Sequence, residues 1–375
     1  MAMNPKDKNL LRGLAIMLAL CLGVLWVGLK IFGDALRFVG ALTSTYGAGR
    51  AAISFHKAFI KQAVDPKKFG SWAIVTGCTG GLGQEFVHRI AARGMNLVLI
   101  SRSKAKLDAL AAEVKSQHGV EAAVLAFDFA RCSAEEEAVF YGQALPAFVA
   151  AAPVEGNVGL LVNNVGVGDE APFAVEEITI ADVADMVKVN CGAIVNMSRA
   201  ILPLLKHRKG GAVINVSSGS CAQPSPYLAT YASTKAFDLH FSKSCAREYA
   251  EFGVAVLGIR PYYIAGTGLY PSNKPSLNAP AAKAVVEGAF AHLGKYEISH
   301  AYWMHGVLGF LFGTLFEDPI AGAIIARLAT RAGVNGTMLH IQKQARERSK
   351  AKKAESWTPV DTASAEHLKR LGCKA

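Results

Sequence analysis

The sequence lacks the cysteine pattern of a disulfide framework or of a zinc site. Its seven cysteines are odd in number and include no Cys-x-x-Cys pair. Secreted disulfide-rich domains and zinc-binding modules are therefore not expected. The pattern favours free thiols in a reducing compartment, and we predict no metal site.

Acidic residues are also scarce, with 29 Asp and Glu against 40 Lys and Arg, which gives a net charge of +11. Such an excess can serve nucleic acid, an anionic membrane or a phosphate-rich ligand. Aromatic residues do not alternate with Arg along one face, so we do not expect a nucleic-acid partner. Six of the basic residues instead crowd residues 343–353 near the C-terminus.

Long apolar runs are rare, and the clearest one lies near the start of the chain. Gly13–Leu29 is uncharged throughout, and as a helix it would span roughly 25 Å, close to a ~30 Å hydrocarbon core. No small-x-small cleavage site follows it promptly, so an uncleaved anchor is favoured over a signal peptide. We predict a membrane anchor over residues 1–33 and a connector helix over 34–68.

From Phe69 onward, short apolar runs alternate with helical patterns, and no internal repeat is visible. The expected strands are 72–75, 97–100, 122–127, 158–162, 212–216 and 254–259. The expected helices are 82–93, 104–118, 134–151, 181–206, 228–252 and 281–294. This alternation predicts an α/β fold, a Rossmann-type doubly wound parallel sheet over residues 69–300, with ligands at the carboxyl ends of the strands.

The pattern changes again after residue 300. Ala301–Phe316 is apolar except for His305, and a second apolar run follows Pro319. Because Pro319 divides the stretch into pieces too short to span a bilayer, we predict a membrane-associated segment over 301–335, with packing into the core as the alternative. Residues 336–375 are predicted to be a basic tail.

A glycine-rich motif, Thr-Gly-Cys-Thr-Gly-Gly-Leu-Gly, follows the first expected strand and opens the first helix. Glycines at such a turn let backbone amides approach a pyrophosphate at a helix N-terminus. The predicted cofactor-binding residues of this turn are Gly77, Thr79, Gly81, Leu82 and Gly83. Arg102 follows the second strand, where a free ribose 2′-hydroxyl would favour an acidic residue, so the predicted cofactor is NADP.

A serine, a tyrosine and a lysine form the candidate catalytic group. Tyr231 and Lys235 lie four residues apart on one face of an expected helix, and Ser218 follows a strand. An ammonium beside a phenol favours the phenolate and so makes an acid–base group. A loop serine, a core tyrosine and a surface lysine are the alternative reading of these three residues taken alone.

The order of these motifs, together with Asn163, Gly166 and Asn190, resembles the short-chain dehydrogenase/reductase family over about residues 69–295. The resemblance implies that Asn190 serves a proton relay, that Ser218 polarises the substrate, and that Tyr231 and Lys235 transfer protons and bind the ribose. It also implies cofactor contacts by Asp128 near the adenine, by Asn163 and by Pro261.

Three further segments, 69–73, 101–103 and 260–263, are similar to the membrane-bound very-long-chain 3-oxoacyl-CoA reductases and to the related 17β-hydroxysteroid dehydrogenases. The resemblance implies NADPH-dependent reduction of long-chain 3-oxoacyl-CoA in fatty acid elongation. It places the enzyme at the endoplasmic reticulum membrane with its catalytic domain facing the cytosol. An acyl-CoA substrate, membrane lipid, elongase partners and a homodimer are the expected partners. The alternatives are a 17β-hydroxysteroid dehydrogenase and an NADP-binding membrane scaffold without catalysis.

Overall fold

The computed structural model describes residues 63–310, apart from 152–156, 169–172, 223–224 and 268–272. The chain divides into two compact units, 1–53 and 54–375, and the described residues all belong to the second. The expected anchor, most of the expected connector and the basic tail lie outside the described residues. Among the residues described, no helix combines the length and the apolar character needed to cross a membrane.

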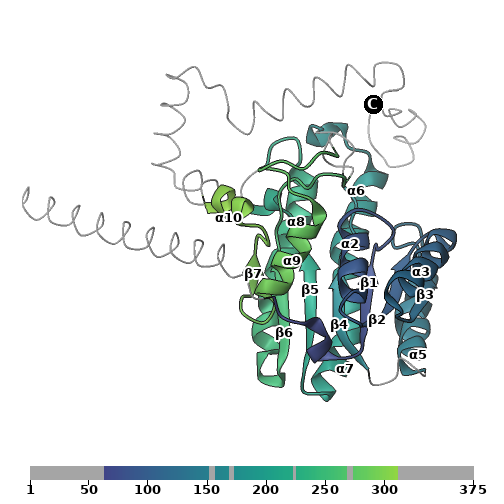
Figure 1. Ribbon diagram of the computed structural model, residues 1–375. Coiled ribbons are helices and arrows are strands. Elements are labelled where there is room, and N and C mark those ends of the chain that lie inside the picture. The colour runs from purple at the N-terminus through teal and green to yellow at the C-terminus, as the bar shows by residue number, and fades with distance from the viewer. Residues whose placement is uncertain (1–62, 152–156, 169–172, 223–224, 268–272, 311–375) are drawn as a thin grey trace, which may run out of the picture. The chain divides into compact units, whose positions relative to one another are not determined.

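A parallel sheet of seven strands forms the centre of this unit (Figure 1). Its strands are β1 (Trp72–Thr76), β2 (Asn96–Ser101), β3 (Ala122–Ala126), β4 (Val158–Asn163), β5 (Gly211–Val216), β6 (Val254–Ile259) and β7 (Ile298–Ser299). They lie in the order β3-β2-β1-β4-β5-β6-β7. The predicted Rossmann-type sheet is therefore confirmed, and β7 is an additional edge strand too short to leave an apolar run in the sequence.

Helices cover both faces of the sheet, and each face has its own core. One core includes residues of α2 (Gly81–Ala91), α3 (Lys104–His118) and α9 (Ala282–His292). The other includes residues of α5 (Leu145–Ala150), α7 (Ala193–His207) and α8 (Ala229–Glu248). Successive residues of β2 alternate between the two cores, and all five residues of β1 are buried. Burial on both faces explains why these strands read as continuous apolar runs.

Two of the expected long helices contain a π-helical turn. The first consists of α4 (Ala134–Val139), η2 (Phe140–Ala144) and α5. The second consists of α6 (Ile180–Met186), η4 (Val187–Gly192) and α7. A π turn widens a helix by one residue and is frequent at functional sites. Here η4 contains Asn190, one of the predicted catalytic residues.

The remaining described elements are short. They are the 3₁₀ turns η1 (Pro66–Phe69), η3 (Val175–Glu177), η5 (Gly219–Ala222) and η6 (Ala250–Phe252), and the helix α10 (Trp303–Phe310). In α10, His305 is fully buried, whereas Trp303 and Val307 are partly exposed. The described part of the expected membrane-associated segment thus presents one buried and one exposed face.

Candidate active site

The predicted site residues gather at the carboxyl edge of the sheet, around the point where the strand order reverses between β1 and β4. The glycine turn follows β1, Asn163 ends β4, and Ser218 follows β5. In an open α/β sheet, this switch point is where ligands bind. The topology therefore brings together residues that are far apart in the sequence.

The glycine turn leaves the N-terminus of α2 open to an anion. Gly80 is the N-cap residue, no side chain caps the helix, and its first turn contains no acidic residue. A Cβ added at Gly80 would meet nothing within 4 Å, whereas one at Gly83 would lie 2.3 Å from the Gly77 carbonyl oxygen. The uncapped amides and the open space fit a pyrophosphate. Gly77, Thr79, Gly81 and Leu82 all lie in this turn or at the start of α2.

Side chains from β1 and from the residues after β4 hold this turn in place. The Asn164 side-chain amide donates to the carbonyl oxygens of Thr76, at 3.1 Å, and Gly77, at 3.0 Å. The Thr76 hydroxyl oxygen accepts from the backbone amides of Asn164 and Val165. Sequence reasoning missed Thr76 and Asn164 as supports, although their positions at two strand ends were a usable signal.

The end of β2 lies beside the same turn. The hydroxyls of Thr79 and Ser101 are hydrogen-bonded at 3.1 Å. Arg102 comes next and is exposed, and Ser103 caps α3 by accepting from the Lys106 amide. Arg102 therefore occupies the edge expected for contacts with the cofactor ribose. Farther along, the Asp128 carboxylate accepts from the amides of Ala130 and Arg131 and so shapes the loop after β3.

Ser218 lies in a loop that is fixed from the neighbouring strand. Its hydroxyl oxygen accepts from the Ser220 amide and from the Ser220 hydroxyl, at 3.2 and 3.0 Å. The Pro261 carbonyl, just after β6, accepts from the Gly219 amide at 2.7 Å. With Ser220 donating to its oxygen, the Ser218 hydroxyl proton can be directed at a substrate oxygen. Pro261 thus positions the serine loop.

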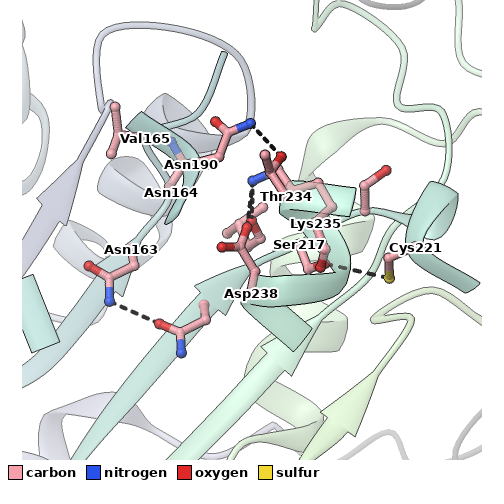
Figure 2. Close-up of polar contacts among 12 residues, drawn as sticks. Asn163, Asn164, Val165, Asn190, Ser217, Cys221, Thr234, Lys235 and Asp238 are labelled. Atoms are coloured by element: carbon pink, nitrogen blue, oxygen red, sulfur yellow. Dashed lines mark hydrogen bonds and ion pairs between the residues drawn. The ribbon is translucent and has the colours of Figure 1, made fainter. Parts of the chain in front are cut away.

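Lys235 is buried on α8, one helical turn after Tyr231, and Figure 2 shows it beside Asp238. Its ammonium donates to the Val216 carbonyl at 3.1 Å and to the Asp238 carboxylate at 2.9 Å. Burial by itself disfavours the charged form, but the attraction of Asp238 and Tyr231 outweighs that effect and raises the pKa of Lys235. The lysine therefore stays positively charged next to the tyrosine.

Asn190 joins the π turn to the loop after β4. Its side chain accepts from the Val167 amide at 2.8 Å, and donates to the Val167 carbonyl and to the Thr234 hydroxyl, both at 2.9 Å. The bond between Asn190 and Thr234 spans the two sides of the site in Figure 2. Asn190 thereby fixes the loop that faces Tyr231 and Lys235.

Glycines let that loop approach the catalytic pair closely. A Cβ at Gly166 would lie 3.3 Å from Lys235 Nζ, and one at Gly168 would lie 3.2 Å from the Tyr231 ring. The described backbone of the loop therefore forms a wall against both side chains.

Asn163 occupies a different place from the other predicted residues. It is buried, and its amide donates to Asn215 at 2.9 Å and to Ser198 at 3.2 Å. In Figure 2 its hydrogen bond leads to the neighbouring strand and not to Lys235. It connects the ends of β4 and β5 beneath the site.

Histidine, cysteine and carboxylate side chains do not assemble into a metal site within the described part of the chain. Five cysteines in that part are free thiols. Burial raises the pKa of Cys78, which lies within the glycine turn, to about 12, so this thiol stays protonated and unreactive.

A dinucleotide-binding turn beside an acid–base pair, both at the switch point of a Rossmann sheet, defines a nicotinamide-dependent oxidoreductase. Comparison with known families agrees with this class. Residues 71–277 match the family model described as short chain dehydrogenase. The chain belongs to the short-chain dehydrogenase family, whose members are oxidoreductases acting on CH–OH groups.

The individual relatives that resemble this chain carry names that do not agree on activity. The very-long-chain 3-oxoacyl-CoA reductase of Anas platyrhynchos is 33% identical over 77% of this chain and 91% of its own length. The human protein called inactive hydroxysteroid dehydrogenase-like protein 1 is 34% identical over 67% of this chain and 74% of its own length. A short-chain dehydrogenase from Sphingobium yanoikuyae, solved in complex with NADPH, superposes with a TM-score of 0.51 at 25% identity, covering 59% of this chain and 83% of its own.

Proposed function

We propose that this protein reduces long-chain 3-oxoacyl-CoA to 3-hydroxyacyl-CoA with NADPH. The observation that carries the choice of substrate is the similarity to a very-long-chain 3-oxoacyl-CoA reductase over nearly the full length of that relative. The site supports the reaction type, because Ser218 follows β5 and Tyr231 and Lys235 lie on the next helix, at the same sheet as the dinucleotide turn. The exposed Arg102 supports NADPH, since a guanidinium suits a 2′-phosphate.

In the proposed reaction, each residue of the site has a separate role. The amides at the start of α2 would bind the pyrophosphate, and Lys235 would bind the ribose. Bound NADPH supplies the hydride to the keto carbon. The Ser218 hydroxyl would donate a hydrogen bond to the keto oxygen, and the Tyr231 phenol would transfer its proton to that oxygen as the alcohol forms. Lys235 keeps a positive charge next to the phenol, and Asn190 holds the facing loop in place.

The direct test is an assay of purified protein with NADPH and a long-chain 3-oxoacyl-CoA. Tyr231→Phe removes the proton donor and should lower the rate by a factor of at least about 100, the usual contribution of a general acid. NADPH binding should persist in this variant. Unchanged turnover would contradict the mechanism. Estrone and androstenedione in the same assay test the steroid alternative, and faster turnover of either steroid would replace the acyl-CoA assignment.

A second candidate is an NADP-binding protein without catalysis. The observation that favours it is that a relative named inactive is as similar to this chain as a named reductase. Against it, Tyr231 and Lys235 are both present, and Lys235 is held in a buried ion pair beside the phenol. Full complementation by Tyr231→Phe in cells that lack the activity would favour this candidate.

A membrane location is part of the proposal. The apolar run Gly13–Leu29 supports anchoring in the endoplasmic reticulum membrane with the catalytic domain on the cytosolic side. Long acyl chains partition into bilayers at about 0.8 kcal/mol per buried methylene, so an anchored enzyme could leave the tail of its substrate in lipid.

A further inference from the structure

A buried carboxylate lies directly behind the catalytic lysine. Asp238 follows Lys235 by three residues on α8, and their charged atoms are 2.9 Å apart. The side chains are only 2% and 5% exposed, respectively. With the bond to the Val216 carbonyl, this contact occupies two of the three N–H groups of the ammonium. Among the described residues the third N–H has no acceptor, so it is available to a ligand in the site.

Burying a carboxylate at this position costs free energy that an uncharged side chain would not, so packing alone does not explain Asp238. A buried charge loses its hydration, and pairing recovers that loss only in part. The second carboxylate oxygen, Oδ1, is buried and has no hydrogen-bond partner among the described residues. An amide or an apolar side chain would fill the same space without this loss.

The backbone around Asp238 is also held firmly. The Ser242 hydroxyl donates to the Asp238 carbonyl at 2.6 Å and accepts from the Asn215 side chain at 3.0 Å. Asn215 in turn accepts from Asn163 at 2.9 Å. This chain of bonds links α8 to β5 and β4, so the carboxylate has a fixed position relative to the sheet.

We propose that Asp238 is a positioning residue, whose carboxylate keeps the Lys235 ammonium charged and aimed at the cofactor ribose and Tyr231, and so sets the alkaline limit of the enzyme. The proposal rests on the NADPH-dependent function proposed above, but it does not depend on which ketone is reduced.

The electrostatic surroundings of the pair support this role. Among the described residues, Tyr231 on the same helix and Cys191 of η4 interact electrostatically with Lys235. Cys221 of η5 interacts electrostatically with Asp238. The positive charge of Arg260, after β6, offsets part of the effect of burial on the pKa of Cys221. Burial raises the pKa of both thiols, so they are neutral near pH 7. The carboxylate of Asp238 is therefore the group that balances the charge of Lys235.

Removing the carboxylate should change the pH at which Lys235 loses its proton. Without Asp238, burial favours the neutral amine, so Lys235 should release its proton at a lower pH. Reduction requires the Lys235 ammonium, so this change lowers the pH at which NADPH binding and reduction stop.

The test compares Asp238→Asn with the wild type, both as full-length proteins. NADPH fluorescence gives the dissociation constant of NADPH at each pH, and the rate of ketone reduction is measured in parallel. We expect the alkaline loss of NADPH binding and of turnover to begin about one pH unit lower, the scale of a lost charge partner. Asp238→Leu should show the same shift, because the charge is missing there too.

Ser242→Ala is the matched control. It removes the bond to the Asp238 carbonyl but keeps the carboxylate, so it should lower the melting temperature without moving the pH limit. An Asp238→Asn or Asp238→Leu protein that folds and retains the wild-type pH dependence of NADPH binding would overturn the proposal. An equal shift in Ser242→Ala would do the same. If no acyl-CoA is reduced, the proposed substrate fails, while the NADPH-binding profile still decides the role of Asp238.

Discussion

At the scale of the residue, exposure and burial separate the polar groups of the site into two kinds. Arg102 is exposed at the end of β2, where it can meet the cofactor. Lys235 and Asn190 are buried and hold fixed partners. An exposed charge acts by attracting a ligand, so reversing it should change cofactor choice while leaving the fold intact.

Arg102→Asp should weaken the use of NADPH by a factor of 100 or more while sparing NADH, because repulsion replaces attraction at the 2′-phosphate. The measurement is kcat/KM with each cofactor. Lys104→Asp, the same charge change at an exposed position two residues farther along, is the control and should have a smaller effect. An equal loss with both cofactors would show that Arg102 has a structural role.

His305 is a residue whose effect should appear in stability rather than in catalysis. Its ring accepts from the Tyr262 amide and bonds the Asn278 carbonyl, each at 3.2 Å, and so ties α10 to two loops. Burial lowers the pKa of His305 from 6.5 to about 4. The unfolded chain therefore binds a proton that the folded protein does not, over the range between these two values.

Above pH 6.5, His305 is neutral in both states and its contribution to stability is complete. Between pH 7 and pH 5, the proton taken up by the unfolded state should reduce the free energy of unfolding by about 2 kcal/mol. His305→Gln should remove this pH-dependent term, as measured by urea denaturation at the two pH values. His240→Gln, at an exposed position on α8, is the control. An unchanged slope in His305→Gln would refute the assignment.

At the scale of the element, the turn between β1 and α2 depends on close backbone contacts. Gly83→Ala would place a methyl group 2.3 Å from the Gly77 carbonyl oxygen and 2.4 Å from the Asn164 side chain. The turn must open to admit it, so we expect a loss of roughly 1–3 kcal/mol in stability and of most NADPH affinity. Thermal denaturation and NADPH fluorescence measure the two effects.

Gly80→Ala is the matched control, because its added Cβ meets nothing within 4 Å and its backbone is extended. It should keep the melting temperature close to that of the wild type. If both variants were equally stable, the contact at Gly83 would not constrain the turn.

The elements also show what the sequence could predict. Six strands had an apolar signature in the sequence, and all six are present; five of them are buried, whereas the edge strand β3 is only partly buried. The π turn at Asn190 leaves no such signature, because one extra residue does not disturb the apolar pattern over a long helix. The glycine turn was predictable from the sequence, because its backbone geometry requires glycine. The role of Asp238 was not predictable, because a Lys and an Asp three residues apart on a helix usually form a solvated pair, and the sequence does not show that this pair is buried.

At the scale of the whole molecule, the residues before and after the catalytic unit should determine how the enzyme meets its substrate. Deleting residues 1–32 should release only part of the protein from membranes, because the apolar residues after 300 would still bind lipid. Activity should fall more for long acyl chains than for short ones. Membrane fractionation and paired acyl-CoA assays measure both effects.

The full-length protein in the same membranes is the control for this deletion. A deletion product that is fully soluble and equally active on long and short acyl chains would show that the anchor only directs the protein to its location. The apolar residues after 300 would then be ordinary core.

The central position of β1 has a consequence for the chain while it is being made. One edge of β1 pairs with β2, which follows after a single helix, but Val162 of β4 is 86 residues beyond Thr76. At roughly 5–20 residues per second, a ribosome needs about 4–17 s to supply the second partner. During that interval, a strand with four apolar residues out of five has an unpaired edge that can template aggregation. The nascent chain should therefore depend on chaperones until β4 has emerged.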